Sequence, residues 1–356
     1  MVALIKPSSQ LEKLVREFTL PPDLGFGKCL APVMAKSHFN GQQWSPIELV
    51  PFAPLSLSPA TKALHYGQLI FEGMKAFAVG GRGPFLFRPE DYGRRFQESA
   101  KRMGMPELPV ELFVQGVAST VSAVSSLIPQ NEGESLYIRP LMLADGEGVN
   151  LSPSKTFLFL VMVSPSASYF SAPKVKALIE RVDCRAAPGG TGAAKTAGNY
   201  AASFRASAEA SKLDFQQVLW LDAVEKSYIE EFSGMNFFAR IGDRLVTPAL
   251  TSTILPGVTR RSLITLARQR GVEVAEERLS ISSIIASIKS GRCTEVFTCG
   301  TAAVITPLSA LGEKDGSLYE LPSPAPSGLW AQLRHDLVAV QTGLAPDPHG
   351  WRYPLA

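Results

Sequence analysis

The sequence lacks a strong excess of charge of either sign. Its 356 residues include 35 Lys and Arg against 32 Asp and Glu, which leaves a formal net charge of +3. Long apolar runs are also missing, since the longest, at residues 157–163, is far shorter than the ~20 residues that cross a bilayer. Neither a nucleic-acid partner nor a membrane partner is therefore indicated.

Cysteine and histidine are scarce, with four of each. The cysteines form no Cys-x-x-Cys pair, and no two histidines have the spacing that places both on one helical face. We therefore expect no metal site and no dithiol redox centre. The N-terminus shows neither a secretory signal nor a transit-peptide pattern, so the expected location is the cytoplasm.

The composition is typical of a folded protein, with 46% hydrophobic and 19% charged residues. Apolar periodicity predicts helices over 89–103 and 110–128, followed by strands over 136–143 and 156–163. A Ser-, Pro- and Ala-rich stretch after the second strand has the character of a linker. We expect a mixed α/β protein with domains at 1–165 and 176–356, joined by a linker at 166–175. In the second domain, strands and helices are expected to alternate.

A glycine-rich loop at 189–196 ends in Lys195-Thr196 and superficially matches a nucleotide-binding phosphate loop. That motif requires glycine immediately before the lysine, where this chain has Ala194. A nucleotide-binding NTPase module is thus disfavoured, although it stays as an alternative. A plain turn with a solvated lysine is another.

Small residues on both sides of Lys195 leave room for a planar group against the backbone. A lysine in such a pocket is suited to condense with an aldehyde. Further along, Glu231 shares one face of a predicted strand with Ile229, while Tyr228 and Glu230 share the other. We expect Glu231 to be buried with a cationic or hydrogen-bonding partner, and an ion pair with an arginine is its plain structural interpretation.

Two later turns are suited to hold an anion. Residues 255–260 turn directly into a helix, so unpaired N–H groups face outward there. Residues 300–303 expose backbone N–H groups beside the hydroxyl of Thr301. A reactive lysine, a buried carboxylate and two phosphate-binding turns together are what pyridoxal phosphate requires.

At this point the chain resembles a family, the branched-chain aminotransferases, which are class IV enzymes of fold-type IV. The resemblance is carried, in order, by residues 65–76, 137–140, 189–200, 217–222, 231–236, 253–260, 297–303 and 349–351. It implies two α/β domains with pyridoxal 5'-phosphate at their interface. It also implies reversible amino transfer between L-leucine, L-isoleucine or L-valine and 2-oxoglutarate, with glutamate and 2-oxo acids as the other substrates, by way of an internal aldimine and pyridoxamine phosphate.

The resemblance assigns the cofactor-binding residues by position. Lys195 is implied as the catalytic residue, which holds the cofactor and moves the proton, and Glu231 as the partner of the pyridine nitrogen. Tyr200 matches the tyrosine beside the ring oxygen. Arg95 is implied as the phosphate clamp, with Arg94 as the competing assignment. The remaining phosphate groups are implied at Val258, Thr259 and Thr301.

The substrate-binding residues follow in the same way. Arg139, on one strand face with Tyr137, is implied to admit the side-chain carboxylate of glutamate into an otherwise apolar pocket. The α-carboxylate is assigned to the N–H groups near Ala302 and Ala303. The pocket walls are expected from Tyr66, Phe71, Val149 and Tyr169. Similar enzymes take the loop near Val149 from a neighbouring subunit, which implies a homodimer.

Three further alternatives stay open. A D-amino-acid aminotransferase and an aminodeoxychorismate lyase share the fold and the cofactor that the resemblance implies. A metabolite-binding protein that kept the fold without catalysis is the third.

Overall fold

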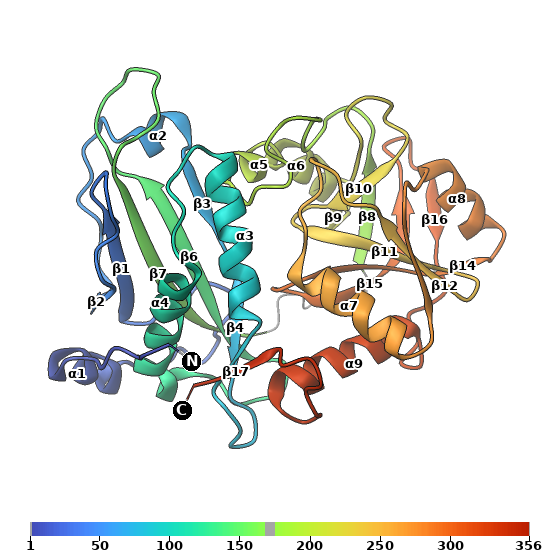
Figure 1. Ribbon diagram of the computed structural model, residues 1–356. Coiled ribbons are helices and arrows are strands. Elements are labelled where there is room, and N and C mark those ends of the chain that lie inside the picture. The colour runs from blue at the N-terminus through green and yellow to red at the C-terminus, as the bar shows by residue number, and fades with distance from the viewer. Residues whose placement is uncertain (1, 168–174, 356) are drawn as a thin grey trace. The chain divides into compact units, whose positions relative to one another are not determined.

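The computed structural model describes residues 2–167 and 175–355. The chain divides into two compact units, which are coloured along the chain in Figure 1. The first unit consists of Met1–Tyr169, Ala194–Ala197 and Ala339–Ala356, and the second of Phe170–Ala193 and Gly198–Val338. Each unit is built on its own β-sheet.

The first unit contains an eight-stranded sheet in the order β17-β5-β4-β6-β7-β1-β2, with β3 beside β6. All of its neighbouring strands run antiparallel. The strands are β1 (Val33–Phe39), β2 (Glu48–Pro51), β3 (Leu69–Phe71), β4 (Met74–Phe77), β5 (Phe85–Phe87), β6 (Ser135–Ala144), β7 (Phe157–Ser166) and β17 (Arg352–Pro354).

The helices of the first unit are α1 (Ser9–Glu17), α2 (Lys62–Tyr66), α3 (Pro89–Arg102), α4 (Val110–Ala123) and the short 3-10 helix η1 (Ser125–Leu127). Phe96 of α3, Phe113 of α4 and Phe159 of β7 form one aromatic cluster, with ring centroids 5.3–6.0 Å apart. Through this cluster, both helices pack against the sheet (Figure 1). The two predicted helices are confirmed, although the second ends at Ala123 before η1.

The second unit contains a nine-stranded sheet in the order β10-β9-β8-β15-β14-β11-β12-β13, with β16 beside β15. An additional pairing of β10 with β11 closes the first six of these strands into a ring. The strands are β8 (Val175–Glu180), β9 (Gln217–Leu221), β10 (Ile229–Phe232), β11 (Met235–Ile241), β12 (Arg244–Pro248), β13 (Glu273–Glu277), β14 (Cys293–Gly300), β15 (Val304–Gly312) and β16 (Leu318–Glu320). Because the ring pairs β10 on both edges, all four of its residues are buried.

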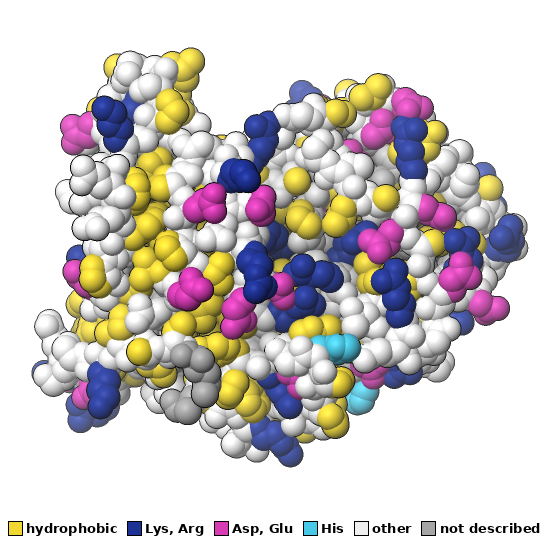
Figure 2. Space-filling model, in the orientation of Figure 1, with side chains coloured by type: hydrophobic (Ala, Val, Ile, Leu, Met, Phe, Trp, Pro, Cys, Tyr) yellow, Lys and Arg dark blue, Asp and Glu magenta, His cyan; other side chains and the backbone are white. Residues whose placement is uncertain are grey.

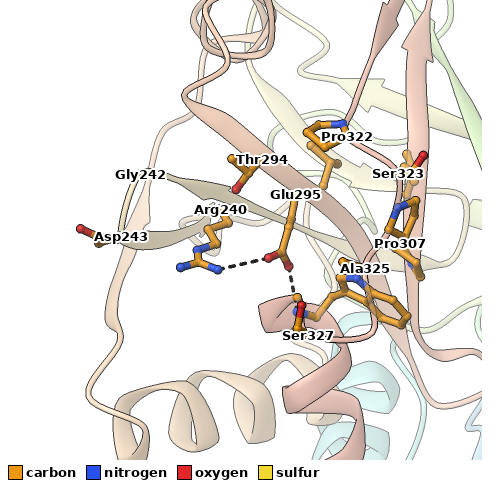
Figure 3. A pocket seen from close by; sticks show the side chains of 15 residues that line it. Arg240, Gly242, Asp243, Thr294, Glu295, Pro307, Pro322, Ser323, Ala325 and Ser327 are labelled. Carbon is orange, nitrogen blue, oxygen red and sulfur yellow. Dashed lines mark hydrogen bonds and ion pairs between the residues drawn. The ribbon is translucent and has the colours of Figure 1, made fainter.

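The remaining helices are α5 (Ala197–Ala201), α6 (Phe204–Lys212), α7 (Val258–Gln269), α8 (Ile281–Lys289) and α9 (Leu329–Thr342). Glu295 of β14 accepts hydrogen bonds from the N–H groups of Leu329 (2.9 Å) and Trp330 (2.8 Å), and it lies 3.3 Å from Arg240 (Figure 3). A carboxylate at this position satisfies unpaired N–H groups and complements the helix dipole of α9. In the described part of the chain, no helix is both long enough and apolar enough to cross a membrane.

The division into units differs from the expected domain boundaries in three places. Ala194–Ala197 and the C-terminal segment from Ala339 belong to the first unit rather than to a domain at 176–356. The physical reason is long-range pairing: Thr196 forms a β-bridge with Ile70, and β17 pairs with β5. Strand β7 continues to Ser166, inside the expected linker at 166–175. Of that linker, residues 168–174 lie outside the described residues.

Candidate active site

Lys195 is held in the first unit by its own backbone. Its N–H donates to Oγ of Ser99 on α3 (3.0 Å), and its carbonyl accepts from the N–H of Phe71 at the end of β3 (3.0 Å). The hydroxyl of Thr196 donates to the carbonyl of Leu69 (2.7 Å). The segment is therefore hydrogen-bonded to both α3 and β3. These bonds restrict its backbone and so fix the point from which the lysine side chain extends.

The side chain of Lys195 lies against an aromatic wall. Its Nζ is 4.7 Å from the centroid of the Phe71 ring, and the guanidinium carbon of Arg139 is also 4.7 Å from it. Arg139 donates from Nη2 to the hydroxyl of Tyr137 (3.0 Å). Gly73 must be small here, because a Cβ at that position would lie 2.4 Å from the Tyr137 hydroxyl. Phe71, Tyr137, Arg139 and Lys195 thus form one cluster.

The two candidate phosphate clamps on α3 occupy different environments. Arg95 is buried and forms a bidentate ion pair with Glu72, with Nε to Oε1 at 2.7 Å and Nη2 to Oε2 at 2.6 Å. Arg94 points to solvent, where it lies 3.3 Å from Asp91 with 66% of its side chain exposed. Burial and fixed orientation favour Arg95 as an anion-binding residue.

In the second unit, Glu231 lies at the centre of a buried polar cluster. Its Oε1 is 3.0 Å from Nε of Arg185, and its Oε2 accepts from Nδ2 of Asn236 (3.3 Å) and from the N–H of Leu255 (3.0 Å). These donors stabilise a carboxylate that is only 3% exposed. The predicted burial of Glu231 is confirmed, and its cationic partner is an arginine, as the plain structural interpretation has it.

Glu230 is buried as well, at 6% exposed, but it belongs to a different environment. One of its oxygens, Oε1, accepts from the hydroxyl of Thr253. Burial raises the pKa of the Glu230 carboxyl above its usual range. The pairing of β10 with β9 shifts register between Ile229 and Phe232, so strict alternation of buried and exposed residues is not kept in this strand.

The first predicted anion-binding turn is built as the N-terminus of α7. Gly257 is the N-cap residue and has no side chain to cap the helix, so the first turn begins with the backbone N–H groups of Val258 and Thr259. A Cβ on Gly257 would lie 2.1 Å from Oδ1 of Asn236. The turn is therefore packed against the same Asn236 that binds Glu231.

The second turn, residues 301–303, joins β14 to β15 in an antiparallel hairpin closed by the pairing of Gly300 with Val304. Thr301, Ala302 and Ala303 make up its tip. Val304 has a φ of 61°, a left-handed conformation that β-branched residues rarely adopt. Backbone strain of this kind is concentrated at ligand-binding segments.

The other predicted residues are less closely gathered. Tyr200 lies on α5, in the second unit, with its ring 3.8 Å from the position of a Cβ on Gly234. Tyr66 is 39% exposed and donates its hydroxyl to the carbonyl of Val149, which lies on the loop between β6 and β7 and is 69% exposed. Tyr169 lies outside the described residues.

Sequence reasoning missed the residues that hold the site residues in place: Ser99, Glu72, Arg185 and Asn236. It also assigned the small residues before Lys195 to a bound group. Gly192 instead packs against the protein, because a Cβ there would lie 2.5 Å from Cα of Thr253. Of these four residues, only Arg185 could have been sought from the sequence, because a buried carboxylate such as Glu231 requires a cationic partner.

The fold and these clusters define an aminotransferase, and a family model for amino-transferase class IV matches residues 69–311. The chain belongs to the class IV aminotransferase family. A probable branched-chain-amino-acid aminotransferase of Streptomyces coelicolor is 42% identical over 356 residues, covering 99% of this chain and 98% of the relative. The branched-chain-amino-acid transaminase 1 of Bacillus subtilis is 39% identical, covering 93% and 94% of the two chains.

Solved structures agree. The branched-chain amino acid aminotransferase of Escherichia coli has a TM-score of 0.75 at 26% identity, covering 90% of this chain and 99% of that one. Another branched-chain amino acid aminotransferase, complexed with N-(5'-phosphopyridoxyl)-L-glutamate, has a TM-score of 0.73 at 27% identity, covering 90% and 98%. The predicted fold and family are thereby confirmed.

Proposed function

We propose that this protein transfers the α-amino group reversibly between L-leucine, L-isoleucine or L-valine and 2-oxoglutarate, with pyridoxal phosphate as cofactor. One observation carries the proposal. Lys195 is fixed at its backbone by Ser99 and Phe71, with its Nζ against an apolar ring, 4.7 Å from the centroid. The branched-chain aminotransferases named above supply the substrate class.

The residues fit this cofactor. It carries an aldehyde, a pyridine nitrogen and a phosphate, and the chain offers a lysine, a carboxylate and a helix N-terminus with glycine at its N-cap for them. Lys195 would hold the aldehyde carbon, Glu231 the ring nitrogen, and Arg95, Val258, Thr259 and Thr301 the phosphate. When bound, the ring supplies an electron sink for the negative charge that develops on the substrate α-carbon.

The chain's own residues supply the proton chemistry and the orientation. Lys195 Nζ would take the proton from the substrate α-carbon and deliver it to C4′ of the cofactor, acting in turn as base and acid. Glu231 is kept in place by Arg185 and Asn236, and its carboxylate would favour the protonated form of the ring nitrogen. Tyr200 would donate its hydroxyl to the ring oxygen, as in the family that the sequence resembles.

The substrate side is formed by the cluster around Phe71. Its ring offers an apolar wall to a branched side chain, while Arg139 offers a cation to the side-chain carboxylate of glutamate. In the described part of the chain, Nε of Arg139 is buried and makes no hydrogen bond. That donor is therefore available to a carboxylate, with Ala302 and Ala303 offering N–H groups to the α-carboxylate.

A homodimer in the cytoplasm completes the proposal. Val149 and Leu151, on the loop between β6 and β7, are 69% and 89% exposed, and Figure 2 shows hydrophobic side chains exposed on this loop at the top of the first unit. Exposed apolar side chains of this kind are typical of interaction sites. Light scattering tests the dimer, and cell fractionation tests the location.

The decisive experiment begins with the absorbance of the purified protein, recorded before and after L-leucine is added. We expect a visible band from the lysine-bound cofactor that disappears with leucine, and glutamate formation once 2-oxoglutarate is supplied. Borohydride reduction followed by peptide mapping should place the adduct on Lys195, and Lys195→Ala should lose both the band and turnover. Activity on D-alanine, or pyruvate release from aminodeoxychorismate, would instead favour the two sister activities.

A further inference from the structure

A cavity of about 430 Å³ lies within the second unit, and Glu230, the neighbour of Glu231 on β10, is among its lining residues. Its volume falls in the range of small-molecule sites, roughly 300–1,000 Å³. The segment before β10, β10 itself, the chain after β12 and the end of β13 line it. None of the residues assigned above to cofactor or substrate lines this cavity.

Glu230 brings an incompletely bonded carboxylate to the cavity. Only 6% of the residue is exposed, and its Oε1 accepts from the hydroxyl of Thr253. Within the described residues, its Oε2 makes no hydrogen bond. A buried carboxylate oxygen without a donor is unfavourable, so a ligand that donates to it gains more than an exposed hydrogen bond would give.

A second cavity in the same unit shows that a buried carboxylate alone does not make a site. It contains Glu295, whose two oxygens accept from the N–H groups that open α9 while Arg240 lies beside them (Figure 3). Each oxygen of that carboxylate therefore has at least one donor from the protein. Glu230 differs because its Oε2 makes no hydrogen bond within the described residues.

The remaining lining residues select the charge and shape of the ligand. Four of them are acidic and one is basic: Asp222, Glu225, Glu230 and Glu277 against Arg278. Arg278 is already paired with Glu225. The field in the cavity therefore excludes anions and attracts a cation. The apolar walls, formed by Pro188, Ala223, Val224, Tyr228, Ile229, Pro248, Ala249 and Ile254, suit a short hydrocarbon chain.

We propose that this cavity binds a small alkylammonium ion, whose N–H group donates to Oε2 of Glu230 while its hydrocarbon chain packs on the apolar wall. Because the bond is charge-assisted and buried, removing the N–H from the ligand or the charge from Glu230 should weaken binding by about 10-fold or more.

The site is connected to Glu231 by direct contacts. Thr253, which donates to Glu230, accepts at its carbonyl from Nη2 of Arg185, and Arg185 is the ion-pair partner of Glu231 at 3.0 Å. A cation bound at Glu230 offsets the charge that now attracts Arg185, so Arg185 binds Glu231 more tightly. This consequence rests on the proposed function, since it matters only where Glu231 holds the cofactor ring. We expect turnover to fall roughly fivefold at saturating ligand.

Calorimetry on the full-length protein tests the site itself. The probe is N,N-dimethylbutylammonium chloride, which has one N–H and forms no imine with an aldehyde. Its matched control is N,N,N-trimethylbutylammonium, which has none. We expect the first to bind about 10-fold more tightly than the second. Equal affinities, or no heat from either salt, would overturn the proposal.

Two variants assign the binding to one carboxylate. Glu230→Gln should lose about 10-fold in affinity, whereas Glu225→Gln, at the rim and already paired with Arg278, should change it less than about threefold. Equal losses of affinity in both variants would mean that the overall negative charge of the cavity attracts the ion. That result would refute the assignment of binding to Glu230. The comparison of the two salts on the unaltered protein remains decisive if a variant folds poorly.

Activity tests the connection separately. In a leucine and 2-oxoglutarate assay, the dimethyl salt should lower turnover at saturating leucine in the unaltered protein but not in Glu230→Gln. Loss that is relieved by more leucine would place the salt in the substrate pocket and refute the coupling. If the protein showed no aminotransfer at all, the proposed function would fail while calorimetry still decided the site.

Discussion

Ser99→Ala tests whether the backbone of Lys195 is held as the structure indicates. The Ser99 side chain is 1% exposed, and its Oγ accepts the Lys195 N–H at 3.0 Å while donating to the Arg95 carbonyl at 2.9 Å. Alanine leaves that N–H without its acceptor, which costs about 1–3 kcal/mol of the free energy of unfolding. A reactive group displaced by about 1 Å loses up to roughly 100-fold in rate. We therefore expect kcat to fall at least about 10-fold, with a smaller change in KM, because Arg139 and Tyr137 are untouched.

Ser119→Ala is the matched control. Ser119 is 0% exposed on α4, and its Oγ accepts the N–H of Ile5 at 3.0 Å, so its loss removes the same kind of bond far along the chain from Lys195. Urea titration should show similar destabilisation in both variants, while only Ser99→Ala loses turnover. Full activity in Ser99→Ala, or an equal loss of rate in Ser119→Ala, would refute the reasoning.

Three further outcomes are expected. Glu231→Gln leaves the buried guanidinium of Arg185 without its carboxylate partner at 3.0 Å, so urea titration should show a loss of about 3–5 kcal/mol in the free energy of unfolding; an unchanged value would contradict the ion pair. Burial raises the pKa of Cys293 to about 12, so iodoacetamide in mildly alkaline solution should label the exposed Cys184 first, and equal rates by mass spectrometry would argue against this burial. Burial also raises the pKa of Glu230, so ionisation of this carboxyl destabilises the fold as the pH rises through that pKa. The free energy of unfolding of Glu230→Gln should therefore increase, relative to that of the unaltered protein, from acid to neutral pH. A difference between the two proteins that does not depend on pH would contradict the raised pKa.

Local patterns predicted the elements that depend on local physics. The apolar stripes of residues 89–103 and 110–128 became α3 and α4, since a helix with one apolar face gains stability only by seating that face on a core. The expected burial of Glu231 also followed from the period of a strand, although Glu230 on the opposite face is buried as well. Both are properties of a short stretch of chain, so no knowledge of distant residues was needed.

Adjacent residues with similar chemistry could not be separated in that way. Arg94 and Arg95 carry the same charge one position apart, yet one points to solvent and the other pairs with Glu72. A helix turns about 100° per residue, so which arginine faces inward depends on how α3 is seated against the sheet. The same holds for Ser99, whose role exists only because residue 195 lies against α3.

By itself, the sequence determined the family. It also predicted Lys195 as the reactive lysine and Glu231 as the cofactor carboxylate, because these predictions depend on residue type and on spacing along the chain. The tertiary structure alone decided that Lys195 is held by Ser99 and Phe71, that Arg185 reaches Glu231, and that Glu230 lines a cavity of its own. Those contacts join residues far apart in the chain. They arise from β-bridges and from the closing of a ring of strands, events that no local period in the sequence records.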